Sequence, residues 1–186
     1  MRQPGRRLGG SRAAGGRTLA KPRASRRRRS GCEFCAIVGG RAPASRVYED
    51  ARALAFLDID PVRRGHLLVI PKVHRAQIWE MDDAECAGVY RCLPKLVRAL
   101  RLAVAADAVN ILSLNGAAGG QTVFDLHFHL IPVHDGQAVL RRKGRRVAFQ
   151  FMQRPAPRTE LLRVAEEIRA HLPGRRRAAR WAKRVQ

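Results

Sequence analysis

The clearest pattern in the chain is a strict alternation of polar and apolar residues over residues 125–130. Alternation with a period of two is typical of a strand with one buried face. Asp125, His127 and His129 would therefore share one face of a strand expected over residues 122–132, with the apolar residues between them on the other. Neighbouring side chains on one face stand about 7 Å apart, close enough to serve one reaction centre.

A glycine-rich turn, Gly119-Gly120-Gln121, directly precedes this strand. Glycine lets backbone N–H groups approach a ligand closely, which favours a functional site at the start of the strand. The alternative is a plain solvent-facing row of polar side chains on an edge strand. The turn makes the functional interpretation the preferred one.

Four more strands are expected from the pattern. Residues 46–50 and 53–59 form a hairpin, and residues 109–115 alternate as another strand. Residues 67–70 are a short, continuous apolar run that ends at Pro71. Such a run is typical of a central strand buried on both faces.

Two helices are expected. Apolar residues recur at helical spacing from Cys86 to Leu100, Asp82 or Asp83 can cap the start, and Pro94 should kink the helix. A second helix covers residues 158–172 and ends before Pro173 and Gly174. Residues 135–154 are basic and show no clear pattern.

The positive charge is concentrated at the two ends of the chain. Residues 1–31 carry ten Arg and one Lys without an acidic residue, and residues 141–186 carry 15 basic and three acidic residues. The segment between them is nearly neutral, with 11 basic and 12 acidic residues. Such ends predict a weak contact with nucleic acid or another polyanion.

The predicted organisation has four parts: an Arg-rich arm over residues 1–30 that cannot form a core, a catalytic domain over 31–140, a basic loop and helix over 141–173 that pack on the domain, and a basic tail over 174–186. There is no apolar run near 18 residues and no secretory signal pattern, so no membrane span is expected.

The chain contains four cysteines, Cys32, Cys35, Cys86 and Cys92. Without a secretory signal they indicate a reducing compartment, and a cytoplasmic location is expected. Cys86 and Cys92 fall on the first helix and are expected to be buried. The Cys32-x-x-Cys35 pair is half a zinc site, a redox dithiol or a coincidence.

Together these segments closely resemble the histidine triad (HIT) family of nucleotide hydrolases and transferases. The resemblance rests on Cys-Glu-Phe-Cys-Ala-Ile-Val-Gly-Gly at 32–40, Ala-Phe-Leu-Asp-Ile at 55–59, and Gly-His-Leu-Leu-Val-Ile-Pro-Lys-Val-His at 65–74. Asn115 with the following Gly-Gly-Gln, and the alternating strand, complete it. The family strand has three alternating histidines, and Asp125 replaces the first of them. His134 matches no position of the family pattern.

The resemblance implies an α+β fold: an antiparallel meander sheet with a long helix and a C-terminal helix, in a homodimer whose sheets join edge to edge. It also implies a hydrolase that cleaves dinucleoside polyphosphates or nucleoside phosphoramidates, with a purine nucleotide as substrate. His127 would be the nucleophile, forming a transient nucleotidyl-histidine and releasing a nucleoside monophosphate.

The resemblance assigns further roles residue by residue. His129, Gln121 and Thr122 would assist the phosphate and the leaving group. His66 would support a neighbouring histidine, Asp58 would bind the ribose, and Asn115 and Gly120 would line the phosphate side. The base pocket would comprise Phe34, Ile37, Phe56 and Ile59.

Some branches of the family carry a structural zinc ion. By the resemblance its ligands here are Cys32, Cys35, His74 and Asp125. A carboxylate oxygen is an acceptable zinc ligand, so the change from His to Asp is compatible with a retained site. The alternative is that Asp125 has lost the metal and orients His127 through a water molecule.

Two other functions are compatible with the same residues. The replacement at Asp125 keeps open a nucleotide-binding regulatory module with slow turnover. The cationic ends keep open an enzyme that removes a nucleotidyl group from nucleic-acid ends.

Overall fold

The structure is a computed structural model that describes residues 31–137, 140–143, 146–149 and 153–174. The predicted arm at residues 1–30, and residues 175–186 of the tail predicted over 174–186, lie outside the described residues. Among the described residues, no helix is both long enough and apolar enough to span a membrane.

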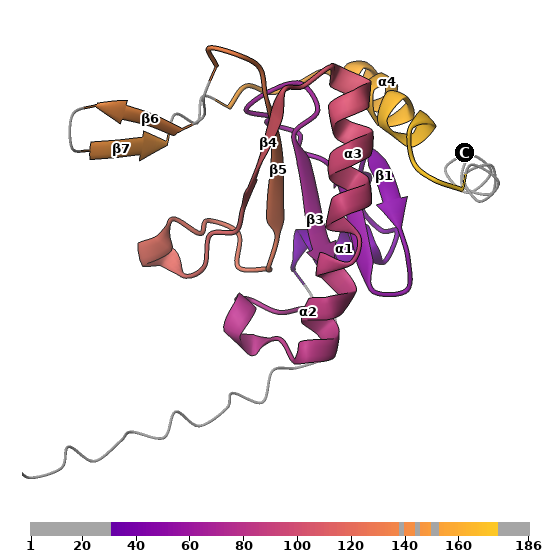
Figure 1. Cartoon of the computed structure of the whole chain (residues 1–186). Coiled ribbons are helices and arrows are strands. Elements are labelled where there is room, and N and C mark those ends of the chain that lie inside the picture. The colour runs from indigo at the N-terminus through magenta and orange to yellow at the C-terminus, as the bar shows by residue number, and fades with distance from the viewer. Residues whose placement is uncertain (1–30, 138–139, 144–145, 150–152, 175–186) are drawn as a thin grey trace, which may run out of the picture.

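The centre of the fold is a five-stranded antiparallel sheet with the order β1-β2-β3-β5-β4. Strands β1, β2 and β3 follow one another in the chain, and β5 lies between β3 and the edge strand β4 (Figure 1). The strands are Arg46–Glu49, Ala53–Leu57, Leu67–Pro71, Ala108–Leu112 and Phe128–Val133. All five residues of β3 are buried, which confirms the predicted central strand. The predicted α+β class is confirmed.

The strand with the alternating pattern begins later than predicted. β5 starts at Phe128, so residues 122–127 approach the sheet without pairing in it. Phe128 is the first residue of the strand to pair with β3, opposite Val69. The predicted separation of faces still holds, because Leu126, Phe128 and Leu130 all enter the main hydrophobic core.

The predicted long helix is two helices, α2 (Asp83–Tyr90) and α3 (Leu93–Val104). Pro94 lies in the first turn of α3, where its missing N–H costs no helical hydrogen bond, so the chain breaks before it rather than bending at it. Asp82 caps α2 as predicted. Its carboxylate accepts from the Glu85 N–H at 2.8 Å, and the Glu85 carboxylate accepts from the Asp82 N–H.

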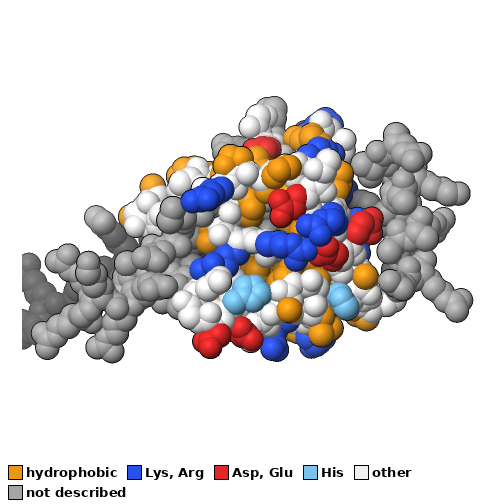
Figure 2. All heavy atoms as spheres, turned by 90° about the horizontal axis from the view of Figure 1, so that it is seen from above, with side chains coloured by type: hydrophobic (Ala, Val, Ile, Leu, Met, Phe, Trp, Pro, Cys, Tyr) orange, Lys and Arg blue, Asp and Glu red, His pale blue; other side chains and the backbone are white. Residues whose placement is uncertain are grey.

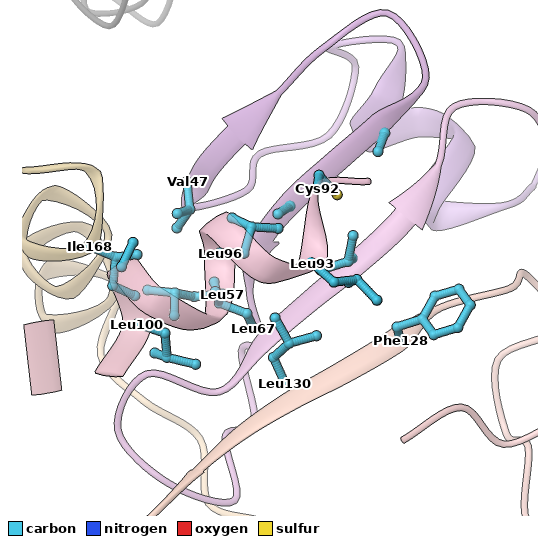
Figure 3. Packing of buried hydrophobic residues seen from close by; sticks show 14 of the residues in the cluster. Val47, Leu57, Leu67, Cys92, Leu93, Leu96, Leu100, Phe128, Leu130 and Ile168 are labelled. Atoms are coloured by element: carbon cyan, nitrogen blue, oxygen red, sulfur yellow. The ribbon is translucent and has the colours of Figure 1, made fainter. Parts of the chain in front are cut away.

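Two apolar layers cover the sheet. On one face α3 and α4 (Arg158–Ala170) pack over it (Figure 3). On the other face the short helix α1 (Glu33–Val38) contributes Phe34 and Ile37 to a smaller cluster that includes Phe56. Cys92 is fully buried in the main core, whereas Cys86 is only partly buried, contrary to expectation.

Three remaining elements are short. Two 3₁₀ turns, η1 (Ile78–Glu80) and η2 (Ala117–Gly119), lie in the loops before α2 and before β5. A two-stranded sheet, β6 (Leu140–Lys143) with β7 (Arg146–Phe149), projects from the main body (Figure 1). This ribbon was not predicted, because three successive basic residues at 141–143 interrupt any alternation.

The surface of the described part mixes charges of both signs. Seen from above, basic and acidic side chains lie next to one another (Figure 2). On α4, Glu167 pairs with Arg64 and Arg163, and Glu166 pairs with Arg169. The acidic residues of α4 are therefore paired with basic neighbours, one of them from the central segment.

Candidate active site and metal cluster

Three histidines from two neighbouring strands meet at one face of the sheet. His66 directly precedes β3, His127 directly precedes β5, and His129 lies in β5 opposite Leu68 of β3. Nε2 of His66 lies 2.9 Å from Nδ1 of His129, and the rings of His127 and His129 are 4.7 Å apart between centroids. The antiparallel pairing of β3 with β5 thus brings residues 63 positions apart into direct contact.

Gly65 explains how His66 reaches this position. Its φ of +91° favours glycine, and a Cβ at this residue would lie 2.9 Å from Cδ1 of Leu100 and 3.0 Å from Cγ1 of Val104. The chain entering β3 therefore passes directly over α3. A glycine is therefore strongly favoured immediately before His66.

His127 is held as a neutral imidazole with a defined tautomer. Its Nδ1 lies 2.7 Å from the backbone oxygen of Asp125, and a carbonyl oxygen only accepts, so Nδ1 carries the proton. Burial lowers the pKa of His127, which keeps the ring neutral near pH 7. Nε2 is consequently an unprotonated nitrogen with a free lone pair.

His66 is fully buried, and its two nitrogens have different partners. Nδ1 accepts from the Val62 N–H at 3.3 Å and lies 3.4 Å from Oδ2 of Asp58. Burial lowers the pKa of His66 to about 3 and that of His129 to about 4. Burial also raises the pKa of the Asp58 carboxyl to about 6. The site therefore disfavours charge on all three groups.

An aromatic wall lies beside His127. The ring of Phe34 meets His127 edge-on at 5.4 Å and Phe56 at 5.6 Å between centroids. Ile37 packs in the same cluster, whereas Ile59 is 61% exposed. Three of the four residues predicted for a base pocket are thus brought together next to the histidines, and the fourth lies at the surface.

The loop before β5 is held by side-chain amides. Gln121 is buried; its Oε1 accepts from the Gly116 N–H at 2.8 Å, and its Nε2 donates to the carbonyls of Ala76 and Val123. Asn115 accepts from the Ile78 N–H at 2.8 Å. These bonds tie residues 113–123 to residues 76–78. Gly120 and Thr122 are exposed on the same loop.

The four residues predicted to bind zinc form one cluster. Their ligand atoms all lie within 4.8 Å of one another, although the residues come from α1, the end of β3 and the approach to β5. Oδ2 of Asp125 lies 3.0 Å from Sγ of Cys32, 3.2 Å from Nδ1 of His74 and 3.8 Å from Sγ of Cys35.

This cluster fits a zinc ion in chemistry as well as in arrangement. Two thiols, one imidazole and one carboxylate make a complete set of four ligands of the types that zinc prefers. Oδ1 of Asp125 is buried and has no hydrogen-bond partner among the described residues, which is costly for a carboxylate without a cation. The residues present therefore fit the metal.

An ion pair that was not predicted supports the cluster. Arg75, the residue after His74, donates from Nε and Nη2 to the Glu85 carboxylate at 2.9 and 2.5 Å, and from Nη1 to the His74 carbonyl. Its own carbonyl accepts from the Leu126 N–H at 2.6 Å. Both charged side chains are buried. Nothing in the sequence distinguishes these two from the many charged residues at the surface.

Comparison with known proteins agrees with this geometry. A family model described as "HIT domain" matches residues 40–136. The chain is 44% identical over 101 residues to "Protein hit" of Bacillus subtilis, covering 54% of this chain and 70% of that protein. It is 45% identical over 101 residues to the adenosine 5'-monophosphoramidase hnt1 of Schizosaccharomyces pombe, covering 54% of this chain and 73% of that protein.

Comparison with solved structures gives a similar protein of the same kind. A crystal structure of a zinc-bound histidine triad family protein from Mycobacterium smegmatis superposes with a TM-score of 0.64 at 36% identity, covering 80% of this chain and 97% of that one. The family model covers more than half of the chain. The chain therefore belongs to the HIT domain family.

Proposed function

We propose that the protein hydrolyses nucleoside phosphate derivatives, either dinucleoside polyphosphates or nucleoside phosphoramidates, through a nucleotidyl group held transiently on His127. The observation that carries the proposal is the state of His127: a neutral ring whose Nδ1–H is bound to the Asp125 carbonyl and whose Nε2 lone pair is free. A nitrogen nucleophile requires this state.

Membership of the HIT domain family supports a nucleotide hydrolase. Relatives named as adenosine 5'-monophosphoramidases, from Schizosaccharomyces pombe and Candida albicans, support the phosphoramidate class of substrate. The reaction and substrate proposed for this chain go further than the family assignment and rest on its own residues.

In the proposed reaction, Nε2 of His127 attacks the α-phosphorus and the bond to the leaving group breaks. The Asp125 carbonyl holds the Nδ1–H of His127 and so stabilises the positive charge that develops on the ring. His129, whose ring is 4.7 Å from that of His127, gives a proton to the leaving group. Water then attacks the nucleotidyl-histidine and releases the nucleoside monophosphate.

The purine base would lie against Phe34, Phe56 and Ile37, with Ile59 at the open end, since this apolar cluster adjoins His127. Asp58 would accept from the ribose hydroxyls. Gly120 and Thr122, exposed on the loop before β5, would contact the phosphate, and Asn115 and Gln121 would hold that loop in place.

We further propose that Cys32, Cys35, His74 and Asp125 bind one structural zinc ion. When bound, zinc would fix α1 to the approach of β5, and with four protein ligands it leaves no open position for water. The zinc-bound relative from Mycobacterium smegmatis supports this assignment.

Rapid-quench kinetics with a radiolabelled adenosine phosphoramidate and with a dinucleoside polyphosphate test the proposal. We expect a burst of protein-bound label that is absent in His127→Ala. Turnover without any nucleotidyl-protein in the wild type would contradict the mechanism. Nucleotide binding with negligible turnover of both substrates would favour a regulatory module instead.

A further inference from the structure

We propose that Asp58, His66 and His129 form a proton relay in which the Asp58 carboxyl group supplies the leaving-group proton and recovers it during hydrolysis. This inference deepens the proposed function and rests on it. It gives Asp58 a role in proton transfer in addition to the proposed contact with ribose.

The three groups lie in a row, with a hydrogen bond between His66 and His129 and a contact between Asp58 and His66 that is longer than an ordinary hydrogen bond. Oδ2 of Asp58 is 3.4 Å from Nδ1 of His66, and Nε2 of His66 is 2.9 Å from Nδ1 of His129. Nε2 of His129 is then the last atom of the row, and it has no partner among the described residues. His66 is fully buried and Asp58 is 9% exposed, so bulk water is excluded from the middle of the row.

The orientation of Asp58 is fixed by its own backbone turn. Oδ1 accepts from the Asp60 N–H at 3.0 Å, and the Asp58 N–H donates to the carbonyl of His66 at 3.0 Å. One carboxylate oxygen is thereby engaged and the other is left facing His66. Asp58 and His66 are adjacent because they flank Leu57 and Leu67, the last pair between β2 and β3.

The buried histidines lack a stable proton donor for the leaving group, and a relay from Asp58 would supply the proton. An amine or alkoxide leaving group requires a proton, yet burial pushes the pKa values of His66 and His129 to about 3 and 4, so neither ring is a stable imidazolium. The charged or titratable groups facing the row are Asp60 beside Asp58 and His127 beside His129. None of these is a cation that could supply the proton.

Protons and electrons balance if the three groups change state together. In the reactive state Asp58 is a carboxylic acid, the form that its raised pKa of about 6 keeps populated as a minor fraction near pH 7. His66 and His129 then each carry their proton on Nε2, and the Val62 N–H favours this tautomer of His66 because it donates to Nδ1. As the bond from phosphorus to the leaving group breaks, His129 protonates the leaving group from Nε2. His66 passes its Nε2 proton to Nδ1 of His129, and Asp58 protonates Nδ1 of His66.

The chain ends as a carboxylate and two neutral imidazoles with protons on Nδ1. Hydrolysis reverses the sequence. Water attacks the nucleotidyl-histidine and loses a proton to Nε2 of His129, the Nδ1 protons move back along the row, and Asp58 is protonated again. The electrons of the phosphorus–nitrogen bond return to Nε2 of His127. No imidazolium forms on His66 or His129 in either half.

The test compares two substrates that share adenosine 5'-monophosphate and differ only in the leaving group: an alkylamine phosphoramidate and a 4-nitrophenyl ester. The amine cannot leave without a proton, whereas 4-nitrophenolate leaves as a stable anion. Leaving-group release is measured in a single turnover, which isolates the first half of the reaction. We expect Asp58→Asn to slow amine release at least about tenfold more than nitrophenol release, a difference of about 1.4 kcal/mol.

The matched control is Asp83→Asn, which removes an exposed carboxylate on α2 that does not face the row, and it should leave the ratio of the two rates unchanged. Equal slowing of both substrates by Asp58→Asn would mean that Asp58 acts only on the shared nucleoside, and would overturn the relay. An Asp58→Asn variant that slows neither substrate would overturn it as well.

A second measurement uses the wild-type protein and does not depend on whether the variant folds. In mixtures of H₂O and D₂O, three protons moving together predict a curved dependence of amine release on deuterium fraction and little dependence for nitrophenol. A linear dependence for the amine overturns the relay. If no nucleotidyl-His127 forms with either substrate, the proposed function itself fails, which separates the two outcomes.

Discussion

The backbone carbonyl of Asp125 accepts a hydrogen bond from Nδ1 of His127 at 2.7 Å, while the Asp125 side chain lies in the cysteine cluster. One residue therefore takes part in both candidate sites: its side chain in the metal cluster and its main chain at the proposed nucleophile. A bound cation would restrain the Asp125 side chain and, through it, the carbonyl that sets the tautomer of His127.

Replacing His127 tests the assignment of the nucleophile. We expect His127→Ala to abolish turnover while nucleotide affinity stays within about tenfold, near 1.4 kcal/mol, because the aromatic wall and Asp58 are left in place. Steady-state kinetics and calorimetric titration with a nucleoside monophosphate measure both quantities. His134→Ala, in the loop after β5, is the control and should keep full activity. Substantial turnover by purified His127→Ala would refute the assignment.

The metal cluster predicts one zinc ion per chain in protein purified without chelator. Cys35→Ser should lose the metal and melt at a lower temperature, because the link from α1 to the approach of β5 is broken. Asp125→His should retain the metal, since imidazole is an equally suitable ligand. Elemental analysis and thermal unfolding give the readouts.

Cys86→Ser is the matched control for this experiment, because Cys86 lies on α2 and outside the cluster. It should change neither metal content nor melting temperature. A wild-type protein that is free of metal and yet fully stable and active would leave the Cys32-x-x-Cys35 pair without the proposed role.

The buried histidines predict a loss of stability in acid. The pKa values of His66 and His129 are lowered from 6.5 to about 3 and about 4, so below pH 6.5 the unfolded chain binds more protons than the folded one. Asp58 opposes this between pH 3.8 and about 6, where its raised pKa makes the folded state bind the additional proton. The two imidazoles change the difference in bound protons more than the one carboxyl does. The free energy of unfolding should therefore fall as the pH drops from 6.5 to 4.

Denaturant titrations at a series of pH values measure this slope. They are best made with Cys35→Ser, so that acid release of a metal ion does not contribute. A free energy of unfolding that stays constant or rises between pH 6.5 and pH 4 would contradict the neutral state of the two rings.

The Arg75–Glu85 ion pair predicts a large cost for removing one partner. Both side chains are buried, so Arg75→Met leaves an uncompensated carboxylate, and we expect a loss of about 3–5 kcal/mol in the free energy of unfolding. The double variant Arg75→Met/Glu85→Leu removes both charges and should recover part of that loss. A double-mutant cycle by denaturant unfolding measures the coupling, and additive effects would contradict it.

Gly65 predicts a backbone-specific effect close to the site. Gly65→Ala requires an alanine at a φ of +91° and a Cβ within 3.0 Å of Leu100 and Val104, which should cost at least about 1–2 kcal/mol. Gly119→Ala is the control, because nothing lies within 4 Å of a Cβ there and its φ is not positive. Thermal unfolding distinguishes them, and equal melting temperatures would contradict the expected strain.

The elements that depend on local periodicity could be predicted from the order of residues along the chain. The continuous apolar run at 67–70 predicted the buried central strand, and the helical spacing of apolar residues predicted the helix over 158–172, where α4 lies. The alternation around His127 assigned Leu126, Phe128 and Leu130 to the core. These predictions succeed because burial of one face imposes a period that is visible along the chain. The later start of β5 was not predictable, because its pairing with β3 begins at Phe128 opposite Val69 although β3 itself continues to Pro71.

The contacts between the polar groups follow from the tertiary structure. The contact between His66 and His129 exists because β3 pairs with β5, and the metal cluster draws on three separate segments. Two contacts could not be predicted from the sequence: the Arg75–Glu85 pair and the approach of Asp58 to His66. The identity of a charged residue does not tell whether it is buried or exposed. The zinc ligands and the nucleophile were expected only through family resemblance. The type of each side chain can be read from the sequence. Its burial and its hydrogen-bond or ligand partners depend on contacts between segments far apart in the chain.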